Sequence, residues 1–330
     1  MKLLTNSILL SSAILAVSSK QLSWQMGEYG QMVLGQPEKP VEPYSSQMKM
    51  ATWKIPNFGE KKMSDPEIVS NYLNIMSRYE MVTIQGIRNY SGKAFKKLVA
   101  NLCRRSGKNY VGITSERLSA RGSSKKEQYG YIYNSDYLKV VDQWQYPIDT
   151  FHFERPPFVV QFELINHATK NGKKLTFVPV NINAFEAIYE TNNLVKVYDA
   201  WLERAKMLRN SEQNKNVIFL GDFTLGDDDE CEYPCLASDL AECWDKIELN
   251  HDPWSGEGRF SWMDAQVGML TTKVNSGCAS DHVVLSGEFM SRDSGICCNK
   301  AYYFDSSLGI TAHGAMKISE HYPVEFEIRP

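Results

Sequence analysis

Short apolar runs typical of β-strands alternate with amphipathic stretches along most of the chain, from Met48 onward. A helix is expected from Ser64 to Tyr79, because Ser64 is followed three residues later by Glu67, as in a capping box. Strands are expected at MKMATWKI, MVTIQGI, YVGIT, YGYIYN, FVVQFEL, KLTFVPVNI and NVIFLGDF, and further helices over 92–105 and 190–208. This mixture favours two mixed sheets packed face to face with helices outside, a layered α/β sandwich.

Residues 1–19 have the pattern of a signal peptide. Lys2 precedes an apolar run from Leu3 to Val17, which polar residues interrupt and small residues follow. The run is shorter and more polar than the roughly 20 apolar residues that a membrane anchor needs. We therefore expect a secreted, extracellular protein that does not associate with membranes. Residues 20–47 are expected to form a loosely ordered extension ahead of one domain over 48–330.

Charge and cysteine content narrow the function classes further. The net charge is -3 and the two signs are interspersed, which argues against a general nucleic-acid-coating protein. Seven cysteines in an exported chain predict disulfides, and the odd count leaves at least one sulfur over. Cys231, Cys235 and Cys243 lack the spacing of a zinc site. The adjacent pair Cys297 and Cys298 is unusual and receives no interpretation from the sequence.

Five short stretches, in order, resemble one enzyme family. They are WKIPNFGEKKMS, RYEMVTIQGIR, FLGDF, SDHVV and SEHYPVE, which begin at Trp53, Arg78, Phe219, Ser280 and Ser319. Together they resemble the deoxyribonuclease I family of the endonuclease/exonuclease/phosphatase superfamily, over about Met48 to Pro330. The resemblance implies a four-layer α/β sandwich, in which helices flank two packed mixed β-sheets.

Members of this family cleave phosphodiesters by metal-assisted attack of water. That chemistry needs carboxylates to hold Mg²⁺ or Ca²⁺, one imidazole to activate water and another to protonate the leaving oxygen. The resemblance places His321, Asp281 and Asp222 at retained catalytic positions. It places Glu127 at the carboxylate that partners the other histidine.

The metal site departs from the family pattern. Gly86 stands where the family has its metal-binding glutamate, and glycine has no ligand to offer. Lys54 replaces the neighbouring asparagine, and its ammonium would repel a divalent cation. Glu320 replaces an aspartate, so Glu320 and Asp222 are left as weak metal ligands at a site that is expected to be lost.

The catalytic and substrate-binding groups depart as well. Asn181 stands at the first histidine position, and an amide cannot shuttle a proton near neutral pH. Thr224 replaces an asparagine that contacts phosphate. Arg88 and Arg155 match positions that can contact phosphate, although both could equally be solvated surface residues.

Two covalent features remain. The resemblance places Cys231 and Cys278 near the family's structural disulfide, with Cys235 as an alternative to Cys231. Asn89-Tyr90-Ser91 is a glycosylation sequon beside Arg88, where a glycan would hinder the approach of duplex DNA.

The joint replacements predict a secreted, catalytically impaired relative of deoxyribonuclease I that acts as a binding or structural protein for an unknown protein partner. No cofactor is expected in that case. In this hypothesis Lys54 takes the cation's role beside the buried carboxylates. The alternative is a weak or specialised metal-dependent endonuclease that hydrolyses DNA phosphodiesters with Mg²⁺ or Ca²⁺.

Overall fold

The computed structural model describes residues 24–26, 32–34, 47–119, 126–148, 151–165, 173–207, 215–225, 259–263, 271–290 and 295–329. The chain divides into two compact units, Met1–Ser45 and Ser46–Pro330. In the first unit, β1 (Trp24–Met26) pairs antiparallel with β2 (Met32–Leu34), within the expected extension. The predicted signal peptide lies outside the described residues. Of the helices described, none combines the length and the apolar character needed to cross a bilayer.

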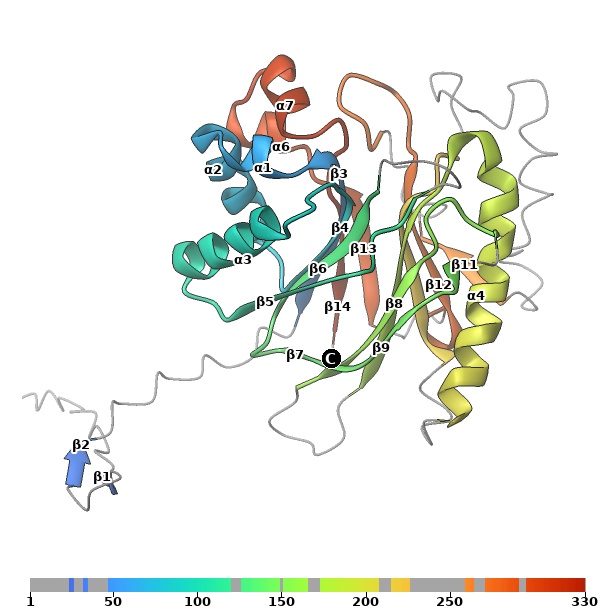
Figure 1. Ribbon diagram of the computed structural model, residues 1–330, viewed down its shortest axis with the longest axis horizontal. Coiled ribbons are helices and arrows are strands. Elements are labelled where there is room, and N and C mark those ends of the chain that lie inside the picture. The colour runs from blue at the N-terminus through green and yellow to red at the C-terminus, as the bar shows by residue number, and fades with distance from the viewer. Residues whose placement is uncertain are drawn as a thin grey trace, which may run out of the picture. The chain divides into compact units, whose positions relative to one another are not determined.

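Two six-stranded mixed sheets form the second unit (Figure 1). The first sheet has the order β13 (Ile296–Ala301), β14 (Val324–Ile328), β3 (Met48–Phe58), β4 (Met81–Ile87), β6 (Gln128–Asn134) and β5 (Tyr110–Thr114). The second has the order β11 (Phe260–Trp262), β12 (Asp281–Ser286), β10 (Val217–Asp222), β9 (Lys174–Asn181), β8 (Phe158–Leu164) and β7 (Leu138–Gln145). The pairs β3–β4 and β9–β10 are parallel and the other pairs are antiparallel.

The two sheets pack against each other through a buried apolar layer. Strands β4, β10 and β12 are buried at every position, as expected for strands that are covered on both faces. Tyr131 on β6 crosses this layer, and its hydroxyl lies 2.8 Å from the carbonyl oxygen of Phe158 and 2.9 Å from that of Phe177. These contacts satisfy a hydroxyl that would otherwise be costly to bury.

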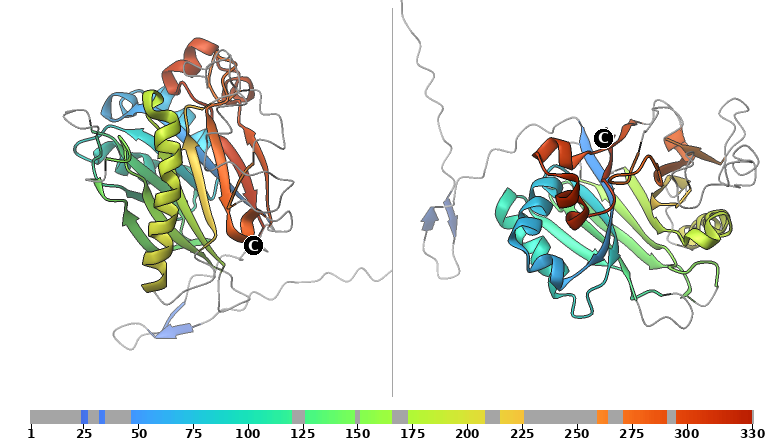
Figure 2. Two further views of the ribbon diagram at one scale, coloured as in Figure 1. Left: turned by 90° about the vertical axis from the view of Figure 1, so that its right-hand side faces the viewer. Right: turned by 90° about the horizontal axis from the view of Figure 1, so that it is seen from above.

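Helices cover the outer face of each sheet (Figures 1 and 2). On the first sheet these are α1 (Glu60–Met63), α2 (Pro66–Met76), α3 (Lys93–Ser106), α6 (Phe304–Leu308) and α7 (Ala312–Ile318). On the second sheet, α4 (Ala187–Met207) buries Leu194, Val197 and Trp201 in a cluster that also contains Phe219 of β10. The predicted four-layer sandwich is confirmed.

The start of helix α2 differs from the prediction. The N-cap of α2 is Asp65, whose Oδ1 accepts the N–H of Glu67 at 2.9 Å, so the predicted capping box at Ser64 was wrong. Pro66 explains the difference, because a residue without an N–H suits the first helical position and fixes where the helix begins.

The sequon residue Asn89 also serves a helix start. Its side chain is only 4% exposed, and its Oδ1 accepts the N–H of Ala94 in the first turn of α3 at 2.8 Å. A glycan on this amide would have to break that packing, so the structure argues against the glycosylation that the sequon suggested.

Candidate functional site

The strand ends bring the predicted site residues together. Asn181 ends β9, Asp222 ends β10 and Asp281 begins β12, and the pairing register places Asp222 opposite both of the other two. Lys54 comes from β3 in the facing sheet, and His321 lies just before β14. Residues far apart in the sequence therefore meet at one end of the two packed sheets.

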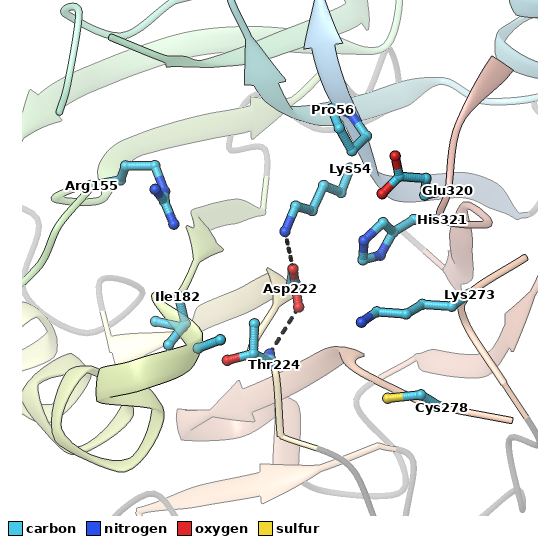
Figure 3. Close-up of a pocket in the computed structure, with 11 residues that line it drawn as sticks. Lys54, Pro56, Arg155, Ile182, Asp222, Thr224, Lys273, Cys278, Glu320 and His321 are labelled. Atoms are coloured by element: carbon cyan, nitrogen blue, oxygen red, sulfur yellow. Dashed lines mark hydrogen bonds and ion pairs between the residues drawn. The ribbon is translucent and has the colours of Figure 1, made fainter. Parts of the chain in front are cut away.

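A pocket with a volume of about 290 Å³ opens among these strand ends (Figure 3). It is lined by Lys54, Pro56, Arg155, Ile182, Ala184, Asp222, Thr224, Lys273, Cys278, Glu320 and His321. Three of the lining side chains are cationic, Lys54, Arg155 and Lys273. The pocket is therefore richer in positive charge than a divalent-cation site should be.

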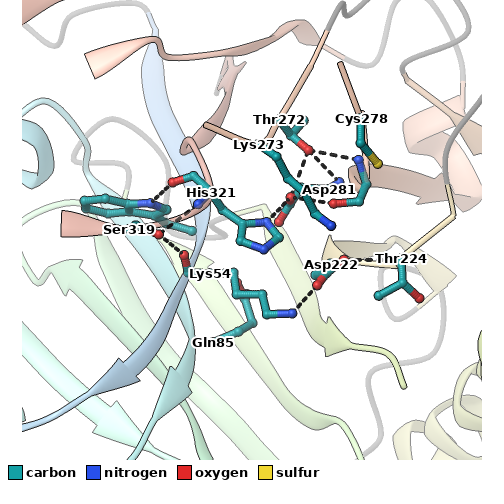
Figure 4. A network of polar contacts seen from close by, with 12 residues as sticks. Lys54, Gln85, Asp222, Thr224, Thr272, Lys273, Cys278, Asp281, Ser319 and His321 are labelled. Carbon is teal, nitrogen blue, oxygen red and sulfur yellow. Dashed lines mark hydrogen bonds and ion pairs between the residues drawn. The ribbon is translucent and has the colours of Figure 1, made fainter. Parts of the chain in front are cut away.

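Lys54 and Asp222 form an ion pair at the centre of this pocket (Figures 3 and 4). The Lys54 ammonium donates to Asp222 Oδ2, while Oδ1 accepts the N–H of Thr224 at 2.8 Å. Asp222 is 1% exposed, and burial would raise the pKa of its carboxyl, but the charges of Lys54 and His321 hold that pKa well below its usual range. Asp222 is therefore ionised and has a partner at each oxygen.

The position of Gly86 excludes a side chain. Its φ is 83°, and a Cβ built there would lie 2.8 Å from the carbonyl oxygen of Ile55. The pairing of β4 shifts register on both sides of this point, between Lys54 and Phe58 and between Ile84 and Ile87. A glutamate is therefore not simply missing at this position. The backbone has a conformation that favours glycine and disfavours any residue with a side chain.

His321 and Asp281 form a second, buried pair (Figure 4). His321 Nδ1 lies 2.6 Å from Asp281 Oδ2, and that oxygen also accepts the hydroxyl of Thr272 at 2.9 Å. The backbone of His321 is held at both ends, with its N–H donating to Ser319 Oγ and its carbonyl accepting from Trp53 Nε1. The ring is thereby fixed, with Nε2 left as the nitrogen available to a pocket ligand.

Glu127 organises the other side of the site. Asn181 Nδ2 donates to Glu127 Oε2 at 3.0 Å, so the two residues meet as the resemblance implied for the histidine and its partner. Arg88 Nε donates to Glu127 Oε1 at 2.9 Å, and Arg155 Nε lies 3.8 Å from Oε2 while it donates to the carbonyl of Asn181 at 2.9 Å. Both arginines, which were expected to contact phosphate or solvent, are thus engaged by protein oxygens.

Comparisons with known proteins agree with this architecture. No family model matches the chain. Over 282 residues it is 29% identical to Deoxyribonuclease-1-like 2 of Mus musculus, across 84% of this chain and 90% of that protein. Over 290 residues it is 29% identical to Deoxyribonuclease-1 of Mus musculus, across 86% and 92% respectively. Over most of its length the chain is similar to proteins of the deoxyribonuclease I family.

Solved structures show the same fold as this chain at low identity. An endonuclease/exonuclease/phosphatase protein from Bacteroides vulgatus superimposes with a TM-score of 0.52 and 12% identity, over 86% of this chain and 99% of that one. A protein of the same superfamily from Bacteroides thetaiotaomicron gives a TM-score of 0.50 and 14% identity, over 86% and 97%. The family generally depends on a divalent metal, so the site residues can be tested for their fit to one.

The residues of this chain do not fit a Mg²⁺ or Ca²⁺ ion. Hard cations need several free oxygen ligands. Both oxygens of Asp222 already accept hydrogen bonds, Gly86 supplies no side-chain oxygen, and the Lys54 ammonium already occupies Oδ2 of Asp222. Glu320 lines the pocket as an exposed carboxylate.

Two parts of the site were not predicted from the sequence. Lys273 lines the pocket because an isolated bridge pairs it with His321. Thr272 Oγ1 accepts the N–H groups of Ser280 and Asp281 at 2.9 and 3.0 Å and thereby holds the start of β12. Both lie in an irregular segment, where the sequence offers no periodicity that would have marked them.

The predicted disulfide is only half described. Cys278 is disulfide-bonded, whereas Cys231 lies outside the described residues, as does the alternative Cys235. The pairing of Cys231 with Cys278 stays a prediction.

Proposed function

We propose that this deoxyribonuclease I-like chain is a secreted, catalytically impaired protein that acts by binding a protein partner. The observation that carries the proposal is the Lys54 ammonium bonded to Asp222. A fixed ammonium supplies the positive charge that the buried carboxylate requires. It cannot supply the other service of a metal, because it offers no vacant coordination position at which water could be activated.

The missing groups account for a large loss of rate. Replacing a general acid or base typically costs about 10²- to 10⁴-fold in rate, and Asn181 stands at one such position. Loss of a metal removes several kcal/mol more of transition-state stabilisation. These losses do not add simply, but the remaining rate should lie several orders of magnitude below that of an intact relative.

The charge of the pocket supports a binding role and indicates the chemistry of the ligand. Lys273 and Arg155 lie in the same pocket as the Lys54–Asp222 pair. An acidic group fits this arrangement better than a cation does, because it would approach the Lys273 ammonium beside that of Lys54. Arg155 adds less, because it is already paired with Glu127 and Glu154. We propose that the partner presents a carboxylate or another anionic group to this pocket.

One observation favours the alternative function. The pair of His321 and Asp281, at 2.6 Å, has the geometry of an acid/base unit and is complete. If the pocket could still recruit a divalent ion, this pair would support a weak metal-dependent endonuclease.

A plasmid-nicking assay in Mg²⁺ and Ca²⁺ separates the two functions, with mouse Deoxyribonuclease-1 as the positive control. We expect the native chain and His321→Ala to be equally inactive. His313→Ala is the matched control, because His313 is exposed on α7. Nicking that His321→Ala abolishes and His313→Ala preserves would establish the endonuclease and refute the proposal.

Secretion is tested separately. The chain expressed in a secreting cell should appear in the medium with an N-terminus near residue 20, because the predicted signal peptide covers 1–19. Recovery of the chain inside the cell with the first residues still attached would contradict this part of the proposal.

A further inference from the structure

The adjacent residues Cys297 and Cys298 bring their sulfur atoms together on β13, an edge strand of the first sheet. The two Sγ atoms are 2.7 Å apart, and neither cysteine is in a disulfide. In a regular strand, successive side chains point to opposite faces of the sheet. Neighbouring cysteines therefore meet only if the strand is locally irregular.

A β-bulge provides that irregularity. The pairing of β13 with β14 slips between Cys297 and Lys300, and Cys298 has a φ of 68°. Glycine adopts this left-handed conformation freely, whereas a residue with a side chain does so at a cost in free energy. The bulge turns the Cys298 side chain towards Cys297, so a costly backbone conformation has a specific geometric result.

A third ligand faces the two thiols. Glu327 on β14 pairs directly with Cys297. One ligand atom from each of Cys297, Cys298 and Glu327 lies within 4.8 Å of the others. In the part of the chain that the structure describes, this is the only group of three or more His, Cys, Asp or Glu side chains with that property.

We propose that Cys297, Cys298 and Glu327 bind a thiophilic divalent cation of the Zn²⁺ class, with a fourth ligand from solvent. Thiolate–zinc bonds of about 2.3 Å in a tetrahedral arrangement place two sulfurs roughly 3.8 Å apart. The observed 2.7 Å requires the sulfurs to separate by only about 1 Å, which side-chain rotation can supply. Both thiols release their protons to solvent as the ion binds.

The surroundings suit such a site. Cys298 is exposed, so an ion can enter, and Cys297 and Glu327 are half-buried. Two thiolates and a carboxylate carry one more negative charge than a divalent ion neutralises. Lys49 lies 3.9 Å from the Glu327 carboxylate and offsets this excess.

A disulfide between the two cysteines is the main competing state. Consecutive Cα atoms are about 3.8 Å apart across a trans peptide, which is less than the roughly 4.4–6.8 Å that disulfides usually span. A disulfide here would therefore close a strained eight-membered ring, so the test keeps both thiols reduced. The proposed cation site also lies at the end of β14 remote from His321, so it is independent of the pocket and of the proposed function.

The test titrates the full chain, reduced with a phosphine, with Zn²⁺ by calorimetry and with Cd²⁺ by ultraviolet thiolate absorption. We expect one ion per chain. Cys298→Ser should weaken binding by about 100-fold or more, and Glu327→Gln by roughly 10- to 100-fold. Cys103→Ser is the matched control, since Cys103 is also a free, half-buried cysteine and should leave binding unchanged.

Several results would overturn the proposal. Unchanged affinity in Cys298→Ser or in Glu327→Gln would show that these residues do not form the site. One ion per two chains would contradict a site completed by solvent within one chain. Circular dichroism of each variant verifies that the fold is kept. Of these variants, Cys298→Ser is expected to disturb folding least, because the Cys298 side chain is exposed to solvent and is not part of the core.

Discussion

Replacing Lys54 by methionine isolates the charge that we place in the metal's role. The methionine keeps most of the length of the lysine stem and removes only the ammonium. Asp222, which is 1% exposed, would then keep the N–H of Thr224 at Oδ1 and lose its partner at Oδ2. The variant therefore tests whether the lysine stabilises a buried carboxylate or merely lies near it.

The expected loss of stability follows from burial. Removing one partner of a buried ion pair costs about 3–5 kcal/mol, because the remaining charge is uncompensated. The Lys54 side chain is 20% exposed, and His321 and Lys273 also lower the pKa of Asp222, so the lower end applies. We expect Lys54→Met to lower the free energy of unfolding by about 3 kcal/mol at pH 7.

The pH dependence gives a sharper signature. In the native chain the pKa of Asp222 is depressed, so its stabilisation is complete above the unfolded value of about 3.9 and is lost as pH falls towards the folded value. Lys54→Met removes the largest influence that lowers the pKa of Asp222, while the burial that raises it remains, so we expect the folded pKa in the variant to lie above the unfolded one. The variant then gains stability as pH falls, by up to about 1.4 kcal/mol for each unit of that difference.

Urea denaturation at pH 7 and at pH 4.5 measures both effects. The gap between the native chain and Lys54→Met should narrow at the lower pH. Asp222→Asn provides the second arm of a double-mutant cycle, in which Lys54→Met should cost less than about 1 kcal/mol. A gap below about 1 kcal/mol at pH 7, or one that does not change with pH, would refute the assignment of Lys54 as the partner of a buried charge.

Three further perturbations test the local geometry. Gly86→Glu should cost about 2–4 kcal/mol in urea denaturation because its Cβ would lie 2.8 Å from a backbone oxygen of β3, whereas Gly92→Ala, with φ 66° and open space, should cost about 1 kcal/mol; equal costs would contradict the bulge. Asn89→Ala should lose about 1–2 kcal/mol by removing a bond to the first turn of α3, and peptide mapping of the exported chain should find Asn89 without a glycan. Cys298→Gly should raise the free energy of unfolding by about 1 kcal/mol, because glycine adopts the φ of 68° at this position freely, and it should abolish cation binding. A lower free energy of unfolding would argue against backbone strain at Cys298.

Much of the fold could be predicted from the sequence because its strands are buried on both faces. The run NVIFLGDF predicts a strand even when its neighbours in the sheet are unknown, and β10 is buried at every position. Helix starts were harder to predict, because Ser64 and Asp65 are both good caps and only Pro66 decides between them.

The site could be located by resemblance, but its new contacts could not. The positions of Asp222, Asp281 and His321 follow from short motifs that the strand ends bring together. Lys273 enters the pocket through a single bridge to His321, which no sequence pattern encodes. Nor does the charge of Arg155 reveal that a protein carboxylate and a carbonyl already engage it.

The burial of Asp222 bears on the proposed loss of the metal. If the site holds no metal, a buried aspartate needs another partner, because an uncompensated charge in the interior costs several kcal/mol. Lys54 compensates the charge of Asp222, so the two residues depend on each other. Lys54→Asn without a metal would leave Oδ2 of Asp222 without its cation. Asp222→Ala would leave the ammonium facing His321 and Lys273. The same dependence explains why no carboxylate is needed at position 86. The Lys54 ammonium already balances the charge of Asp222, the buried carboxylate that it contacts.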